Sequence, residues 1–197
     1  MDLLADLNEP QRRAVTHVDG PLLVLAGAGS GKTRVITRRV AWLIRSGVPP
    51  RNVLAITFTN RAADEMAQRV RALDAPPGAT VCTFHSLCAR LLREFADEAS
   101  LSRNFSIYDR ADQLRLLKEA LERLNVPKGS YTPARAHAAV SRIKNELKTP
   151  EAFAADAGDF RDRELADIYT EYERLLAGNN ALDFDDLLLR MAFLLRD

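Results

Sequence analysis

The chain has 197 residues, of which 47% are hydrophobic, and its formal net charge is +1. This length fits one domain, or a domain with an insertion, and the apolar content is enough for a core. No apolar run approaches the ~20 residues that span a bilayer, and residues 1–6 are neither basic nor long enough for a secretory signal. We therefore expect a globular protein of the cytoplasm with no membrane partner.

Charge and cysteine content further limit the classes of protein to which the chain can belong. Residues 1–95 carry 13 Lys and Arg against 8 Asp and Glu, a balance of +5, whereas residues 96–197 carry 15 against 19, a balance of −4. An anionic ligand is expected in the first half, although a solvated surface would explain so modest an excess equally well. Cys82 and Cys88 lack clustered partners, which argues against both a disulfide framework and zinc.

A short helix is expected directly after Leu7. Asn8 can cap this helix, and Pro10 suits its first turn. The amide of Gln11 offers a donor and an acceptor, which is the pair needed to read an adenine edge. Taken alone, Gln11 is more simply interpreted as a surface residue.

An apolar run at residues 22–26 leads into a glycine-rich turn and a helix. We predict a buried strand followed by a phosphate-binding loop, or Walker A motif, because glycines at 27, 29 and 31 allow backbone N–H groups to surround an anion. Lys32 would reach the β- and γ-phosphates, and the Thr33 hydroxyl could bind Mg²⁺. The alternative is an ordinary strand-to-helix turn with a surface lysine. The general motif has glycine at the position of Ala26.

Two more strand-to-helix units are predicted, with strands at residues 53–58 and 80–84. No hairpin signal separates the units, which favours right-handed crossovers and a parallel sheet. Ligands of such sheets bind at the carboxyl ends of the strands, where Phe58 and Phe84 stand among small hydroxyl residues. These aromatic rings could stack on a nucleic-acid base, or they could simply end buried strands. The composition favours neither interpretation over the other.

From about residue 105 the pattern is almost wholly helical. Helices are predicted to open at Asp109, at Thr132-Pro133 and at Thr149-Pro150, and a long helix to end at Gly178. The second of these helices is basic, and its positive residues are Arg135, Arg142, Lys144 and Lys148. It could touch a nucleic-acid backbone, but a solvated face is favoured because no aromatic residue is interleaved.

Six segments, in this order, resemble the N-terminal part of UvrD/Rep/PcrA-type superfamily 1 DNA helicases. They are residues 7–11, AGAGSGKT at 26–33, ITFTNRAADEM at 56–66, TFHS at 83–86, KNEL at 144–147 and LDFDDLL at 182–188. Ala26 is the residue this family commonly has, and Arg61 keeps the charge of a lysine often found there. The resemblance spans almost the whole chain.

The resemblance implies an α/β fold, in which a P-loop NTPase (RecA-like) parallel sheet is flanked by helices and carries a mostly helical inserted subdomain. Residues 1–97 would be the N-terminal part of motor domain 1A, residues 98–181 the helical subdomain 1B, and residues 182–197 a return segment to domain 1A that is truncated.

The resemblance also implies ATP and Mg²⁺ as cofactors, and single-stranded DNA or a duplex/single-strand junction as partner. Lys32 and Thr33 would be catalytic, and Thr33 would hold the metal. Gln11 would read adenine and Arg39 would pack on it. The implied nucleotide-binding residues are Gln11, Ala26, Gly27, Ala28, Gly29, Ser30, Gly31, Lys32, Thr33, Arg34 and Arg39. The implied DNA path is lined by Phe58, Asn60, Thr83 and His85.

The implied activity is that of an ATP-dependent 3′-to-5′ DNA helicase in repair or replication. Phosphoryl transfer also needs an acidic strand end to hold Mg²⁺ and a further cationic group, and the sequence shows neither. The acidic cluster at 183–186 follows Gly178-Asn179-Asn180 and is interpreted as a helix N-terminus. We therefore expect a helicase fragment that is inactive when isolated. A non-catalytic nucleotide- or DNA-binding module is the alternative, and a small P-loop kinase is a weaker one.

Overall fold

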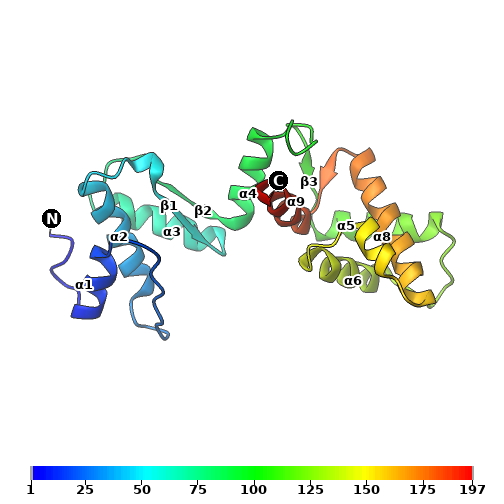
Figure 1. Ribbon diagram of the computed structural model, residues 1–197, viewed down its shortest axis with the longest axis horizontal. Coiled ribbons are helices and arrows are strands. Elements are labelled where there is room, and N and C mark those ends of the chain that lie inside the picture. Colours follow the sequence, from blue (N-terminus) through cyan, green and yellow to red (C-terminus); the bar gives the residue numbers. More distant parts are fainter. Residues whose placement is uncertain (1, 197) are drawn as a thin grey trace. The chain divides into compact units, whose positions relative to one another are not determined.

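The computed structural model describes residues 2–196. It falls into two compact units, Met1–Ser86 and Leu87–Asp197, called here the first and the second unit. Both contain helices and a small parallel sheet, so the mixed α/β class expected from the sequence is confirmed (Figure 1). Of the helices in the described part of the chain, none is long and apolar enough to cross a membrane.

The sheet of the first unit has two strands, β1 (Leu54–Thr57) and β2 (Thr80–Thr83). They are parallel, and Leu54 lies opposite Thr80. Helix α3 (Asn60–Arg71) connects them, and Thr59 caps it by accepting a hydrogen bond from the backbone N–H of Ala62. Both strands fall within the predicted ranges and run in the predicted direction.

Three further elements complete the first unit: α1 (Glu9–Thr16), α2 (Lys32–Arg45) and the short 3₁₀ helix η1 (Pro50–Asn52). Helix α2 stops just before Gly47, whose φ of 101° is a left-handed conformation that suits glycine. The core forms where α2 and α3 cover the sheet, and its buried members are Val40, Ile44, Val53, Ala55, Met66 and Val70.

The predicted strand at residues 22–26 is wrong for this chain. The segment forms no strand ladder within the described residues, and the side chains of Leu23 and Leu25 are 83% and 87% exposed. A strand exists only where a neighbouring backbone satisfies its N–H and C=O groups. The apolar composition predicted a buried strand, but the described residues place no partner beside it.

The second unit is mostly helical. Its helices are α4 (Phe84–Glu94, entering from the first unit), α5 (Arg110–Arg123), α6 (Pro133–Asn145), α7 (Pro150–Asp156), α8 (Phe160–Gly178) and α9 (Phe184–Arg196). Asp109, Thr132 and Thr149 cap α5, α6 and α7 through side-chain oxygens that accept backbone N–H groups. These predicted helix starts, and the end at Gly178, are confirmed.

Two strands of two residues each form the other sheet. Strand β3 (Ser106–Ile107) pairs in parallel with β4 (Ala181–Leu182), which joins the residue ranges before and after the helical block. Helices α5, α6 and α8 share one core around Tyr169 and Tyr172. A second core holds Leu92 of α4 against Leu187 and Met191 of α9.

Candidate functional site

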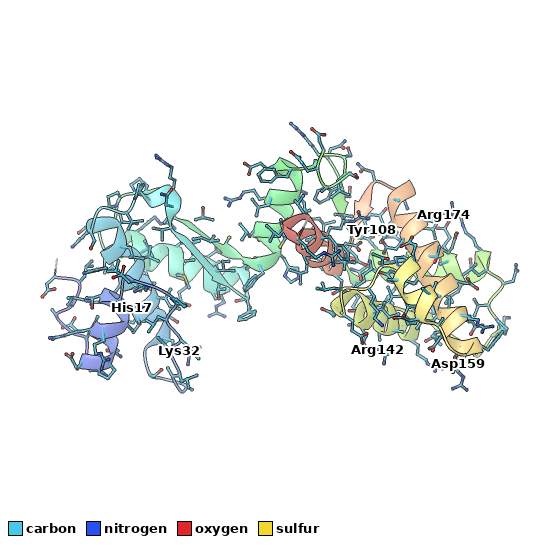
Figure 2. All side chains as sticks on the ribbon, in the orientation of Figure 1. His17, Lys32, Tyr108, Arg142, Asp159 and Arg174 are labelled. Carbon is cyan, nitrogen blue, oxygen red and sulfur yellow. The ribbon has the colours of Figure 1, made fainter. Side chains whose placement is uncertain are left out.

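The glycine-rich turn directly precedes α2, and Lys32 is the first residue of that helix (Figure 2). Gly29 and Gly31 have φ values of 75° and 85°, in the left-handed region that favours glycine. Gly31 is the N-cap of α2 and supplies no side-chain hydrogen bond to its first N–H groups. The turn therefore leaves the positive end of α2 open toward an anion, as a phosphate-binding loop requires.

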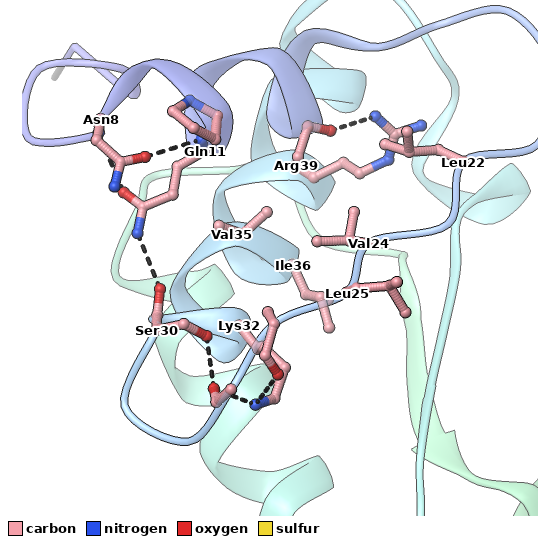
Figure 3. Close-up of a pocket in the computed structure, with 14 residues that line it drawn as sticks. Asn8, Gln11, Leu22, Val24, Leu25, Ser30, Lys32, Val35, Ile36 and Arg39 are labelled. Carbon is pink, nitrogen blue, oxygen red and sulfur yellow. Dashed lines mark hydrogen bonds between the residues drawn. The ribbon is translucent and has the colours of Figure 1, made fainter.

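The Lys32 side chain folds back into this turn. Its Nζ donates to the carbonyl oxygens of Ala26 and Gly27, at 3.0 and 2.7 Å, and Ser30 Oγ donates to Gly27 O at 2.7 Å (Figure 3). These carbonyl oxygens are neutral acceptors, whereas a phosphate oxygen is a charged one and forms the stronger bond with an ammonium group. The ammonium group thus lies where an incoming phosphate could replace its present partners.

Gln11 is brought to the loop by α1. Asn8 Oδ1 accepts the backbone N–H of Gln11 at 3.0 Å, and Gln11 Oε1 accepts that of Asn8 at 3.1 Å, which is a capping box. The remaining amide nitrogen, Gln11 Nε2, donates to Ser30 O at 3.0 Å (Figure 3). The N-terminus of α1 is therefore hydrogen-bonded to the loop.

Arg39 approaches α1 from α2. Its Nη1 donates to the carbonyl oxygens of Ala14, Val15 and His17, at 2.9, 3.3 and 2.5 Å. These oxygens lie at the C-terminal end of α1, where helix carbonyls lack partners within the helix. The guanidinium group thus caps α1 while its side chain forms part of the cavity described next.

These groups surround a cavity of about 650 Å³ in the first unit (Figure 3). Its polar side chains are Asn8, Gln11, Ser30, Lys32 and Arg39, and its apolar walls are Pro10, Ala14, Leu22, Val24, Leu25, Ala26, Val35 and Ile36, with Gly27 completing the lining. Apolar walls with a few convergent polar groups are typical of sites for small organic ligands. The lysine and the open helix end suit phosphate, and the apolar walls suit a planar ring.

The other predicted nucleotide residues lie around this cavity without lining it. Thr33 is exposed on the first turn of α2, and Ala28 and Gly29 are exposed on the turn. Arg34 is directed to Asp6, at 3.4 Å. No carboxylate is among the described lining residues, so a Mg²⁺ ion here would bind the Thr33 hydroxyl, phosphate oxygens and water, a ligand set that this metal accepts.

Aromatic rings stand at the carboxyl ends of β1 and β2. Phe58 is 86% exposed and Phe84 is 44% exposed, and their ring centroids are 5.8 Å apart with a 40° angle between planes. Phe58 therefore lies outside the core of the first unit. Because the two rings are tilted and in contact, a base would stack on the open face of Phe58 rather than between the rings.

The remaining predicted DNA residues differ in their surroundings. Asn60 is exposed at the start of α3, and His85 is half-buried in the first turn of α4. Thr83 is buried, and its Oγ1 bonds Ser86 Oγ at 2.8 Å and accepts the Ser86 N–H at 3.2 Å. Thr83 thus caps the first turn of α4, whereas Asn60 is placed to reach a ligand.

Lys144 was expected on a solvated basic face, and that expectation is wrong. Arg142, on the same helix α6, is exposed (Figure 2), but Lys144 is 1% exposed. Its Nζ lies 2.8 Å from Asp183 Oδ2, 2.7 Å from Asp186 Oδ1 and 2.5 Å from Glu173 Oε1. The signal was present in the sequence, because Lys144 follows buried Val140 by four residues and so shares its helix face.

This ionic cluster joins two of the segments on which the family resemblance rests. Asp183 and Asp186 cap each other through their backbone N–H groups, at 2.8 and 3.0 Å, which confirms the predicted helix N-terminus. The Tyr172 hydroxyl donates to Asp183 Oδ2 at 3.0 Å. Since an ammonium group already stands between the three carboxylates, the cluster is a structural ion group and not a metal site.

Burial and charge act against each other in this cluster. Burial works to lower the pKa of Lys144, but Asp186, Glu173 and Asp183 outweigh it and raise that pKa well above its usual value. Burial also raises the pKa of Asp183, yet the charge and hydrogen bond of Lys144 leave it below its usual value. For Asp186 burial prevails and raises the pKa to about 7. The cluster thus holds one proton more readily than an exposed group of carboxylates would.

Comparison with known proteins gives consistent matches over nearly the whole chain. A family model for the UvrD/REP helicase N-terminal domain matches residues 7–197. The chain is 47% identical over 191 residues to the ATP-dependent DNA helicase PcrA of Bacillus subtilis. It is 46% identical over 190 residues to the proteins of the same name from Staphylococcus epidermidis and Staphylococcus aureus. These matches cover 95% of this chain but 26% of each relative.

Proposed function

Because the chain belongs to the UvrD/REP helicase N-terminal domain family, we propose that its first unit is the ATP-binding part of a P-loop, RecA-like motor domain. The observation that carries this proposal is the cavity in which Gln11, Lys32 and Arg39 meet. Phosphates would lie against Lys32 and the N-terminus of α2, and the adenine between the apolar walls and Gln11. Thr33 would bind the Mg²⁺ ion of the nucleotide.

The second part of the proposal concerns nucleic acid. Single-stranded DNA, or the single-stranded side of a junction, would cross the carboxyl ends of β1 and β2. Phe58 would stack on a base, Asn60 and His85 would contact the strand, and Thr83 would support the turn beneath it. The support comes from the exposed Phe58 ring and the positive balance of the first half of the chain.

The sequence matches the N-terminal domain of this family. For the whole protein we propose the activity of an ATP-dependent 3′-to-5′ DNA helicase that serves repair or replication in the cytoplasm. Domain 1A at residues 1–97, subdomain 1B at 98–181 and the return segment at 182–197 remain the proposed division. The relatives named ATP-dependent DNA helicases are about four times as long, since the match covers 26% of their length.

We propose that the 197-residue chain binds ATP without hydrolysing it. Strands β1 and β2 end at Thr57 and Thr83, and no carboxylate lines the cavity within the described residues. The acidic pair after β4 is already bound by Lys144. A group to orient water and Mg²⁺ is therefore not found among the described residues near the nucleotide site. The alternative, a module that acts by binding alone, predicts the same behaviour for this chain.

Nucleotide binding is tested with the fluorescent analogue mant-ATP and Mg²⁺. The parent chain should bind, and Lys32→Ala should bind roughly 10- to 100-fold more weakly, because hydrogen bonds to charged groups contribute ~1.5–3 kcal/mol. Lys118→Ala, an exposed lysine of the second unit, is the matched control and should bind like the parent. Failure of the parent to bind would overturn the nucleotide site. ATP turnover that rises with single-stranded DNA, and that Lys32→Ala abolishes, would overturn the proposed inactivity.

DNA binding is tested by the anisotropy of a labelled single-stranded oligonucleotide at low salt. Phe58→Ala should weaken binding by roughly tenfold, because stacking on one ring contributes ~1–3 kcal/mol. Sequence preference should be slight, and binding should weaken as salt is added. Phe160→Ala removes a similarly accessible ring, 78% exposed in the second unit, and should leave DNA binding unchanged. If folded Phe58→Ala binds as tightly as the parent, the DNA path across this sheet is wrong.

A further inference from the structure

Arg39 holds α1 by its C-terminal end. Its Nη1 donates to the carbonyl oxygens of Ala14, Val15 and His17. A positive charge at the C-terminal end of a helix also interacts favourably with the helix dipole. Two hydrogen atoms are thus shared among three acceptors. The contact is a cap made by a side chain of α2, more than 20 residues further along the chain.

The other end of the same helix carries Gln11. Helix α1 has only eight residues, so its two ends move together. The Gln11 amide donates to Ser30 O, and it packs on Gly31, where an added Cβ would lie 3.1 Å from Gln11 Nε2. A small tilt of α1 would therefore move the Gln11 amide relative to the loop and the cavity.

We propose that Arg39 is a positioning residue for Gln11: by capping α1 it fixes the amide that distinguishes one nucleotide base from another. This inference rests on the proposed nucleotide site and adds to it. The resemblance implies only that Arg39 packs on adenine, a contact that Arg39 would make independently of Gln11. The positioning role instead couples Arg39 to Gln11, so that removing either side chain lowers the preference for one base as much as removing both.

Lysine separates the two roles. A lysine at position 39 keeps a positive charge and hydrogen-bond donors for the carbonyls of α1, but it lacks the planar guanidinium group that stacks on a base. Arg13→Ala is the matched control, because Arg13 is an exposed positive residue in the last turn of α1 itself and does not line the cavity.

The experiment measures the preference for ATP over GTP by competition with mant-ATP on the 197-residue chain. Gln11→Ala should lower the preference by roughly five- to tenfold, the value of one hydrogen bond. Arg39→Ala should lower it by the same factor, the double variant by no more than either single variant, and Arg39→Lys by much less. Arg13→Ala should keep the parent's preference, and circular dichroism confirms that each variant folds.

A multiplied loss in the double variant, with no rescue by Arg39→Lys, would show that Arg39 contacts the base directly and would overturn the inference. A second measurement needs no nucleotide: amide hydrogen exchange of residues 9–16 should be clearly faster in Arg39→Ala than in Arg13→Ala, because Arg13→Ala removes a charge from the last turn of α1 but leaves the hydrogen bonds that Arg39 donates. Equal exchange in both variants would also overturn it. If the parent chain binds no mant-ATP, the proposed function fails, and the exchange measurement still decides whether Arg39 holds α1.

Discussion

Lys144 shows what a single residue does for the second unit. The side chain of Lys144 is 0% exposed. Its ammonium group faces the carboxylates of Glu173, Asp183 and Asp186, which come from α8 and from the start of α9. A buried ion group of this kind adds little over apolar packing, but removing one partner leaves the others as uncompensated charges. Lys144 therefore fixes α6 to the residues that follow the helical block.

Lys144→Met keeps the volume of the side chain and removes its charge. We expect the free energy of unfolding to fall by ~3–5 kcal/mol, because three carboxylates would remain buried without their cation. Urea denaturation followed by circular dichroism measures this change. Lys118→Met, on the surface of α5, should cost less than about 1 kcal/mol. Equal losses in the two variants would contradict the structural role given to Lys144.

The raised pKa of Asp186 predicts that the stability of the chain decreases as the pH rises. Its pKa is raised to about 7 in the folded chain from the ordinary 3.8, so the folded state binds the proton more tightly than the unfolded state. The stability that this group contributes is present below its unfolded pKa and is lost as the pH rises through about 7. Asp183 has a lowered pKa, so it is ionised in both states over that window.

The melting temperature of the parent should accordingly fall as the pH rises from the unfolded pKa of 3.8 toward the folded pKa of about 7, and it should level off above about 7, where Asp186 is ionised in both states. Asp186→Asn should flatten this fall, because its amide cannot titrate. Asp185→Asn alters the neighbouring carboxylate, which lies outside the ionic cluster, and should keep the parent's slope. A slope that Asp186→Asn leaves unchanged would show that the proton is held elsewhere.

At the scale of elements, the sequence predicted helices better than strands. Helix starts at Asn8, Thr59 and Asp109 depend on a cap within three residues, so local sequence is enough to find them. A strand depends on a partner far along the chain, so the run at 53–58 pairs with residues 80–83 while the equally apolar run at 22–26 pairs with nothing described. Strands β3 and β4 are too short for any pattern to reveal.

In the candidate site too, local features could be predicted and contacts between distant helices could not. The glycine-rich turn before α2 is a local motif, and its glycines and Lys32 could be singled out from spacing alone. The cap that Arg39 places on α1, and the ion pairs of Lys144 with residues 39 and 42 positions away, depend on how helices pack and could not. The basic composition led us to expect Lys144 on a solvated face, although its spacing from Val140 indicates the buried face of α6, and neither pattern reveals the carboxylates that meet it there.

The exposed apolar segment gives a prediction about elements. Replacing Leu23 and Leu25 together by threonine should change the free energy of unfolding by less than about 0.5 kcal/mol, because neither side chain packs in a core. Val53→Thr, a change of the same kind in the core of the first unit, should cost ~1–3 kcal/mol for a buried hydroxyl. Chemical denaturation compares the two. A comparable loss in both would mean that residues 22–26 are packed in solution.

At the scale of the whole molecule, the proposed nucleotide site and the ionic cluster lie in different units. The proposed nucleotide site lies in Met1–Ser86, where the sequence has its positive excess, and the ionic cluster lies in Leu87–Asp197. The family assignment came from segments in both units, since the matched range runs from residue 7 to residue 197. Ligand effects should therefore appear in the first unit, whereas the effects of pH on Asp186 should appear in the second.

The central claim is that ATP binds at the loop before α2, and amide hydrogen exchange with and without MgATP tests it most directly. We predict slower exchange on binding in two regions, residues 9–16 of α1 and residues 27–36 of the loop and the start of α2, and no change in α5, α6 or α8. Lys32→Ala should remove the protection. Protection absent from residues 27–36, or confined to the second unit, would contradict the account.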